Sequence, residues 1–191
     1  MHRIGGLIIG ESHTDKSPKQ FLVDNMHLFK SLGVTILYME HLLTDPHQGL
    51  LDEYLQTPTD APMPIELKLY LNLLDQEHDL SGSASFTAVV EAAKRHHIQI
   101  IAIDTEATYR LGISDSMKAL FDYSSQQQRF RAMNMAMIEK YQTYDQGTNY
   151  IAFVGSAHVA TYLQTPGISD LLGCPHIAIY DQNDVKKEHI E

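Results

Sequence analysis

Five short apolar segments, each separated from the next by a stretch with helical periodicity, constrain the fold of this chain more than any other feature. They are rich in the β-branched and aliphatic residues that favour strands, and they span residues 3–10, 34–40, 98–104, 149–155 and 176–181. Strands that alternate with helices form a parallel sheet, because each helix carries the chain back across a face of the sheet. The sequence therefore predicts an α/β fold, with a central, mainly parallel sheet of about five strands and helices on both faces.

The intervening stretches predict the helices and the domain organisation. Apolar residues at helical spacing indicate helices over residues 17–33, 45–56, 63–80, 85–97 and 124–144. The first helix is predicted to begin with Ser17 as its N-cap and Pro18 at its first helical position. Region 44–97 is predicted to form a helical cap over one end of the sheet. A length of 191 residues suits one domain, so we expect residues 1–191 to form a single α/β domain.

Charge and cysteine content narrow the classes of function. The formal net charge of −10 disfavours binding to a phosphate backbone, so we expect no nucleic-acid partner. No apolar run approaches the roughly 20 residues of a membrane span, and the N-terminus lacks the features of a signal peptide. The one cysteine, Cys174, cannot form an internal disulfide and is expected in the core or in a turn. We expect a cytoplasmic protein, or a domain excised from a larger secreted protein.

Four of the five predicted strands end in carboxylates and imidazoles. These residues are Glu11 and His13 at the end of the first strand, Glu40 and His41 at the end of the second, Asp104 at the end of the third and His158 after the fourth. In an open parallel sheet, ligands bind at the carboxyl ends of the strands, so we expect these side chains to converge on one edge. The simpler alternatives are solvated strand-end turns and, for Asp104, a turn-capping role.

A cluster of this composition supports two kinds of chemistry. Carboxylates and imidazoles can hold a divalent metal ion, or they can activate water directly, with a carboxylate beside a histidine as general base. The chain has no glycine-rich phosphate loop and no G-x-S-x-G nucleophile elbow, which disfavours phosphate binding and serine catalysis. Arg131, on the fifth predicted helix, could pin a strand-end carboxylate, and a surface role suits it equally well.

Two short motifs resemble a known group of proteins. Gly10-Glu11-Ser12-His13 and Gly155-Ser156-Ala157-His158 resemble the paired G-x-x-H motifs of the TIKI/TraB superfamily. That superfamily includes ChaN-type haem-binding proteins, erythromycin esterases, TIKI metalloproteases and the Ras-cleaving endopeptidase domains of bacterial toxins. The G-E-x-H form, followed by Glu40-His41, is most similar to the toxin and esterase branches. Arg131 with Met135 is similar to the R-x-x-x-M helix of the superfamily.

The resemblance implies a hydrolytic site with Glu11, His13, Glu40 and His158 as its core and His41 beside them. In the metalloprotease branch, His13 and His158 would hold one divalent ion such as Zn, Mn or Co. In the toxin branch, the same positions activate water without an obligatory metal. We add Asp104 and Arg131 to the site as supporting residues.

We predict a water-activating hydrolase, a peptidase or amidase that acts on a peptide or protein substrate as a toxin or effector domain. Glu40 or Glu11 is the predicted general base. His158 would stabilise the oxyanion or protonate the leaving group, and His13 would orient water or bind metal. One alternative is a non-enzymatic module that holds haem or a metal ion. The other is a catalytically silent interaction domain.

Overall fold

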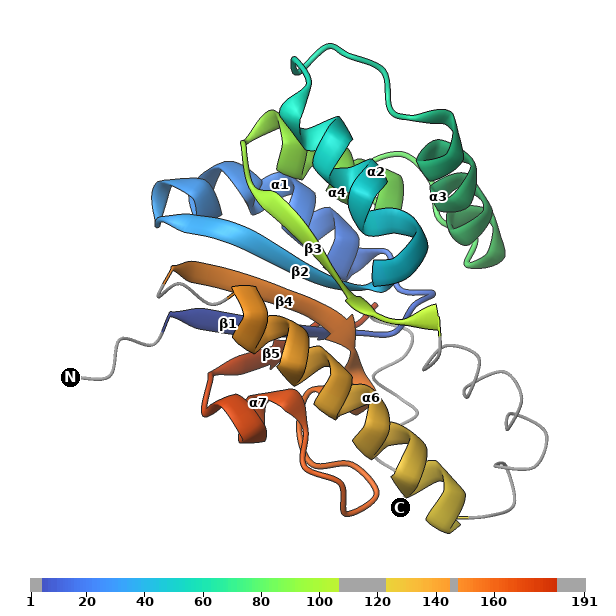
Figure 1. The fold of residues 1–191 in the computed structure, drawn as a ribbon, viewed down its shortest axis with the longest axis vertical. Coiled ribbons are helices and arrows are strands. Elements are labelled where there is room, and N and C mark those ends of the chain that lie inside the picture. Colours follow the sequence, from blue (N-terminus) through green and yellow to red (C-terminus); the bar gives the residue numbers. More distant parts are fainter. Residues whose placement is uncertain (1–4, 107–122, 145–147, 182–191) are drawn as a thin grey trace.

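One parallel sheet forms the centre of the molecule (Figure 1). The computed structural model describes residues 5–106, 123–144 and 148–181. Every neighbouring pair of strands is parallel, and the order across the sheet is β3-β2-β4-β1-β5. The strands are β1 (Gly6–Glu11), β2 (Val34–Leu43), β3 (Gln99–Asp104), β4 (Asn149–Gly155) and β5 (His176–Ala178). The predicted five-stranded α/β fold is confirmed, although β5 is three residues shorter than predicted.

Helices cover both faces of the sheet (Figure 1). One layer packs on Leu37 and Met39 of β2, whereas α6 packs on Ile36 and Tyr38 of the same strand. The first layer comprises α1 (Ser17–Ser31), α2 (Thr44–Gln56), α3 (Ile65–Glu77) and α4 (Phe86–Arg95), and the second comprises α6 (Tyr123–Tyr144) and α7 (Ile168–Leu172). This alternation follows from the two-residue period of a strand, which sends successive side chains to opposite faces. No helix within the described residues is both long and apolar enough to cross a membrane.

Strand β2 continues three residues beyond its predicted end at Glu40. Its pairing with β3 shifts register between Met39 and Leu43, where Leu43 pairs with Asp104. A regular strand would send Glu40 and His41 to opposite faces. Across this irregularity both side chains are buried and border the same cavity. The extension of β2 therefore brings two adjacent polar side chains to one place.

The start of α1 differs from the prediction. Lys16, rather than Ser17, is the N-cap residue, and its side chain makes no capping hydrogen bond. The backbone N–H groups of Lys16 and Ser17 instead donate to the carboxylate of Asp181, at 3.0 and 2.8 Å. Burial raises the pKa of Asp181, but the hydrogen bonds from Ser17 and Lys16 outweigh burial and lower the pKa overall. The predicted Ser17 N-cap is therefore wrong, because a distant carboxylate satisfies these helix-terminal donors.

The helices of region 44–97 take three different positions. Helix α2 covers the outer edge of β3, where the Gln48 amide accepts from Ala102 N at 2.8 Å and donates to Ile100 O at 3.1 Å. Helix α4 packs against α1 and the sheet. Helix α3 reaches the carboxyl end of the sheet, where Tyr70 Oη donates to His41 O at 2.9 Å. Gln48 thus satisfies backbone groups that an edge strand would otherwise leave open.

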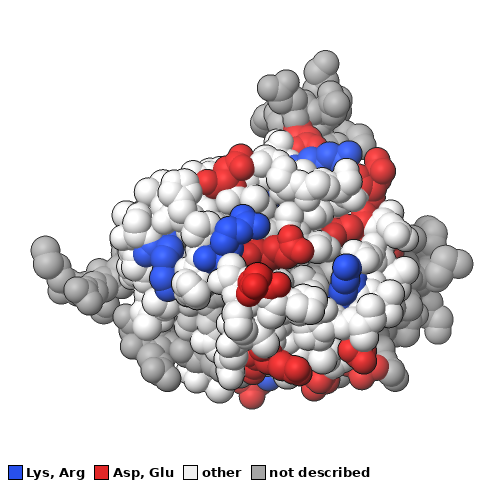
Figure 2. Space-filling view, turned by 90° about the horizontal axis from the view of Figure 1, so that it is seen from above, with Lys and Arg blue, Asp and Glu red and all other residues white. Residues whose placement is uncertain are grey.

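The molecular surface is mixed in charge. Figure 2 shows acidic and basic side chains interspersed on one face, with no continuous basic area among the described residues visible there. This distribution agrees with the net charge of −10.

Candidate functional site

A cavity of about 540 Å³ lies at the carboxyl ends of β1 to β4. Side chains from α3 and α6 complete its walls. Six of the seven predicted site residues line it, namely Glu11, His13, Glu40, His41, Asp104 and His158. The convergence expected from parallel strand ends is therefore present in the structure.

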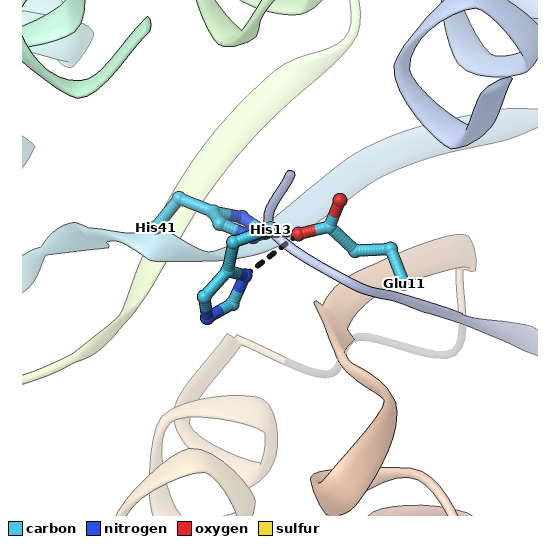
Figure 3. A group of neighbouring side chains, drawn as sticks. All are labelled: Glu11, His13 and His41. Carbon is cyan, nitrogen blue, oxygen red and sulfur yellow. Dashed lines mark hydrogen bonds and ion pairs between the residues drawn. The ribbon is translucent and has the colours of Figure 1, made fainter. Parts of the chain in front are cut away.

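The first half of the site consists of Glu11 and the three side chains that donate to its carboxylate, His13, His41 and Lys19 (Figure 3). His13 Nδ1 and His41 Nε2 both donate to its Oε1, at 2.8 and 2.7 Å, and Lys19 Nζ donates to its Oε2. Burial raises the pKa of Glu11, but the charge of His41 and the hydrogen bonds from His13 and His41, with the charge of Lys19, lower the pKa to about 2. The carboxylate of Glu11 is thus ionised, and both of its oxygens accept hydrogen bonds. Glu11 orients its partners and is not free to take a proton.

Lys19 is a central residue that the sequence analysis missed. Its side chain is fully buried, and its ammonium also donates to the carbonyls of Ser12, His13 and Asp15, at 3.2, 2.8 and 2.8 Å. Burial lowers the pKa of Lys19, against the charge and hydrogen bond of Glu11. A signal was present in the sequence, because Lys19 lies three residues before Leu22 on the buried stripe of α1.

Burial in the core favours the neutral form of the His41 ring. It packs against Phe86 and Phe153, with centroid distances of 4.3 and 4.9 Å. Burial lowers the pKa of His41, and the charge and hydrogen bond of Glu11 only partly offset that effect. Because Nε2 donates to Glu11, the neutral ring carries no proton on Nδ1, which has no hydrogen-bond partner among the described residues. His41 therefore supports Glu11 from within the core.

His13 has a more open environment and faces the cavity. Its side chain is 44% exposed, and Nδ1 is engaged with Glu11 (Figure 3). Burial lowers the pKa of His13, but the hydrogen bond to Glu11 and the charges of Glu40 and Glu11 outweigh burial and raise the pKa overall. His78, which sequence reasoning gave no role, lies 5.6 Å away between ring centroids. The raised pKa favours the protonated form of His13 at the cavity.

Glu40 and His158 form the second half of the site. Glu40 Oε2 accepts from the backbone N–H of Gly155 at 2.6 Å, and Oε1 lies 3.5 Å from His158 Nε2. Burial raises the pKa of Glu40, but the charges of His158, His13 and His41 and the Gly155 hydrogen bond lower it overall. Glu40 is therefore a buried carboxylate that stays ionised beside an imidazole.

Asn134 of α6, a second residue that the sequence analysis missed, determines which nitrogen of His158 carries the proton. Its Nδ2 donates to Pro166 O at 2.9 Å, which leaves Oδ1 to face His158 Nδ1 at 2.6 Å. An amide oxygen only accepts, so His158 Nδ1 must be the donor. In the neutral ring, Nε2 is then an unprotonated acceptor directed at Glu40.

The motif glycines are needed for close approach. A Cβ on Gly155 would lie 3.2 Å from His13 Cε1 and 3.5 Å from Glu40 Oε2. A Cβ on Gly10 would lie 2.5 Å from Val159 Cγ2, too close for any side chain without movement. Gly155 therefore allows the two halves of the site to meet without a side chain between them.

Arg131 does not reach this cavity. It is exposed on α6 and borders a different cavity of about 420 Å³, together with Gln127 and Gln164. Three residues further along α6, Asn134 is the side chain that contacts His158.

Asp104 does line the first cavity, and its Oδ1 accepts from Thr105 N at 2.8 Å, as in a turn.

Cys174 lies at the other end of the sheet. It precedes β5, and its Sγ is 2.8 Å from Tyr150 Oη near the beginning of β4. Because the strands are parallel, this position is at the amino edge, opposite the cavity. Cys174 is therefore not a member of the site.

Glu11, His13 and His41 are the one group within the described ranges with metal-ligand proximity, their candidate atoms lying within 4.8 Å of one another. His13 and His158, the predicted ligand pair, do not form such a group there. Both imidazoles, however, direct N–H groups at the same carboxylate oxygen, and the Lys19 ammonium holds the other oxygen. A divalent ion needs lone pairs and would meet a buried positive charge. In this arrangement the donor set does not fit a metal ion.

Comparison with known proteins places this chain beside bacterial toxin effector domains. No model of a known protein family matches the chain. It is 28% identical over 188 residues to the multifunctional-autoprocessing repeats-in-toxin protein of Vibrio vulnificus, a match that covers 96% of this chain and 3% of that protein. The chain is thus homologous to a small part of a much longer toxin.

The chain also matches solved structures of bacterial toxin domains. The crystal structure of RRSP, a MARTX toxin effector domain from V. vulnificus CMCP6, has a TM-score of 0.69 and 26% identity, and it matches 93% of this chain and 33% of that chain. The C-terminal region of Pasteurella multocida toxin, described as having a thiol-protease-like catalytic triad, has a TM-score of 0.69 and 18% identity over 96% of this chain and 24% of that chain. At that identity the Pasteurella toxin shares the fold alone. The chain spans about a third of the RRSP structure.

Proposed function

We propose that this chain is a peptidase-like hydrolase of the toxin-effector kind that activates water between Glu40 and His158. The observation that carries the proposal is the separation of 3.5 Å between Glu40 Oε1 and His158 Nε2 at the cavity. In the neutral ring with the proton on Nδ1, both atoms accept protons. A water molecule that donates one proton to each acceptor keeps its lone pairs free for attack. His13 borders the same cavity and supplies an acid.

The reaction follows from these positions. The water oxygen forms a bond to the carbonyl carbon of the substrate while its proton passes to the pair formed by Glu40 and His158. The C–N bond then breaks as His13 Nε2–H donates a proton to the leaving nitrogen. Glu11 orients His13, so of the two predicted general bases this proposal assigns the role to Glu40 alone.

A protein is the proposed substrate. The homology to part of a MARTX toxin and the similarity to its RRSP effector domain support an effector that acts on a protein. A cysteine nucleophile is not part of the proposal, because Cys174 lies at the opposite edge of the sheet. The resemblance to toxin domains that cleave Ras makes a Ras-type GTPase the first defined substrate to test.

The test compares new protein N-termini after incubation of the protein with host-cell lysate and with a purified Ras-type GTPase. We expect the wild type and a Glu53→Gln control to generate the same new N-termini by mass spectrometry, because Glu53 is exposed on α2. A Glu40→Gln variant should generate none. If the wild type yields no new N-terminus, or if Glu40→Gln cleaves like the wild type, the peptidase proposal fails.

Metal independence is a separate expectation. Because Lys19 and two N–H donors occupy Glu11, dialysis against a chelator should leave cleavage unchanged. Elemental mass spectrometry before and after dialysis should find no stoichiometric Zn, Mn or Co. Activity that is lost with the chelator and restored by one of these ions would contradict this expectation.

Asn134 gives a prediction about proton placement. An Asn134→Ala variant should lose about 10–100-fold in kcat, because the His158 ring remains but its Nδ1–H acceptor is gone. Nitrogen-15 NMR should show the Nδ1–H tautomer of His158 in the wild type and a mixture in the variant. Asn72→Ala, at an exposed position of α3, serves as the control. An unchanged tautomer in Asn134→Ala would contradict the assignment.

A further inference from the structure

The ammonium of Lys19 occupies a cage of oxygen atoms. Glu11 contributes a carboxylate oxygen, and Ser12, His13 and Asp15 contribute backbone carbonyls. The ring of Phe86 closes another side, with its centroid 4.6 Å from Nζ. Carboxylate and carbonyl oxygens are the ligands that hard cations select, so this cage is built for positive charge.

The cage shares Glu11 with the two histidines. Oxygen Oε2 faces the ammonium, whereas Oε1 accepts from both imidazoles. Without the ammonium, a buried carboxylate and two imidazole nitrogens would remain within 4.8 Å of one another. A carboxylate with two histidines is a common ligand set for Zn²⁺. The two imidazoles can lose these protons when they bind a metal ion, whereas the ammonium is a fixed positive charge beside Glu11.

We propose that Lys19 is the resident cation of this site, which neutralises Glu11, fixes the turn from residue 11 to residue 15 and keeps divalent metal ions out. As a statement about catalysis, this inference rests on the proposed function, because Glu11 and the turn position His13. As a statement about cation binding, it stands on the contacts of the ammonium alone. Lys19 is thus a positioning residue.

Zn²⁺ titration of the full chain tests the inference without reference to hydrolysis. Calorimetry should find that Lys19→Met binds Zn²⁺ at one site at least about tenfold more tightly than the wild type. Lys16→Met is the matched control, because Lys16 is a half-exposed lysine three residues earlier. Its Zn²⁺ affinity should equal that of the wild type. Adding His41→Ala to Lys19→Met should abolish the gain.

Two results would overturn the inference. One is a folded Lys19→Met protein whose Zn²⁺ affinity equals that of the wild type. The other is a wild-type protein that binds Zn²⁺ through Glu11, His13 and His41. Circular dichroism establishes whether the variant folds, and hydrolysis is not measured, so failure here is distinct from failure of the proposed function.

If Lys19→Met does not fold, the wild type decides the question by NMR. The ring nitrogen resonances of His13 and His41 should stay in place when Zn²⁺ is added, while those of exposed histidines such as His27 shift. Zn²⁺-induced shifts confined to His13 and His41 would show that the ammonium does not exclude a metal ion.

Discussion

A His158→Ala variant should lose about 10²–10⁴-fold in kcat on a cleaved protein substrate while keeping its fold. The substitution removes one of the two acceptors that hold the attacking water and leaves the first half of the site, around Glu11, untouched. Initial rates on the substrate found by N-terminal mass spectrometry give the measurement, with circular dichroism as the check on folding.

His27→Ala is the matched control for this variant. His27 is exposed on α1 and does not border the cavity, so its removal should leave kcat unchanged. A folded His158→Ala protein with wild-type turnover would remove His158 from the mechanism.

The second large effect concerns stability. Glu11→Gln should lower the free energy of unfolding by about 3–5 kcal/mol, because the fully buried Lys19 ammonium loses its counter-charge. Urea unfolding at neutral pH measures the change. The exposed Glu53→Gln variant should stay within about 0.5 kcal/mol of the wild type. Equal losses in the two variants would show that the buried ion pair contributes nothing specific.

The same carboxylate predicts a direction for the pH dependence. The pKa of Glu11 is lowered from 4.5 to about 2 on folding, so its contribution is complete above pH 4.5 and is lost as the pH falls towards 2. The wild type should therefore lose more stability than Glu11→Gln over this interval. Glu40 and Asp181 also have lowered pKa values and act in the same direction in both proteins, so the difference between the two curves reports Glu11. Parallel curves would contradict the assignment.

The sheet and the main cluster could be predicted because they follow from local pattern and one topological rule. Apolar strands between helices make a parallel sheet, and parallel strands end together. Glu11 ends β1 and His158 lies three residues beyond the end of β4, so the topology alone brings these two residues to one edge. Glu40 was predicted at the same edge, but β2 continues three residues beyond it.

The remaining parts depend on contacts between distant segments. Nothing in the local sequence distinguishes Asn134 from other polar residues of a long helix, because its partners come from residues 158 and 166. Arg131 is one turn away and was the more conspicuous choice by charge. Lys19 was missed because a lysine near the start of a helix is usually solvated, so its charge argued against a buried position. The shift of register in β2 has no sequence signature of its own.

The Asp181 carboxylate that closes the start of α1 has a consequence for how such a domain can be released from a longer polypeptide. Its two hydrogen bonds join the segment after β5 to the turn just before Lys19. A processing cut before residue 181 would leave the amide groups of Lys16 and Ser17 without this acceptor and loosen the segment that carries the buried ammonium. Asp181, three residues beyond the end of β5, therefore belongs to the structure that supports the start of α1.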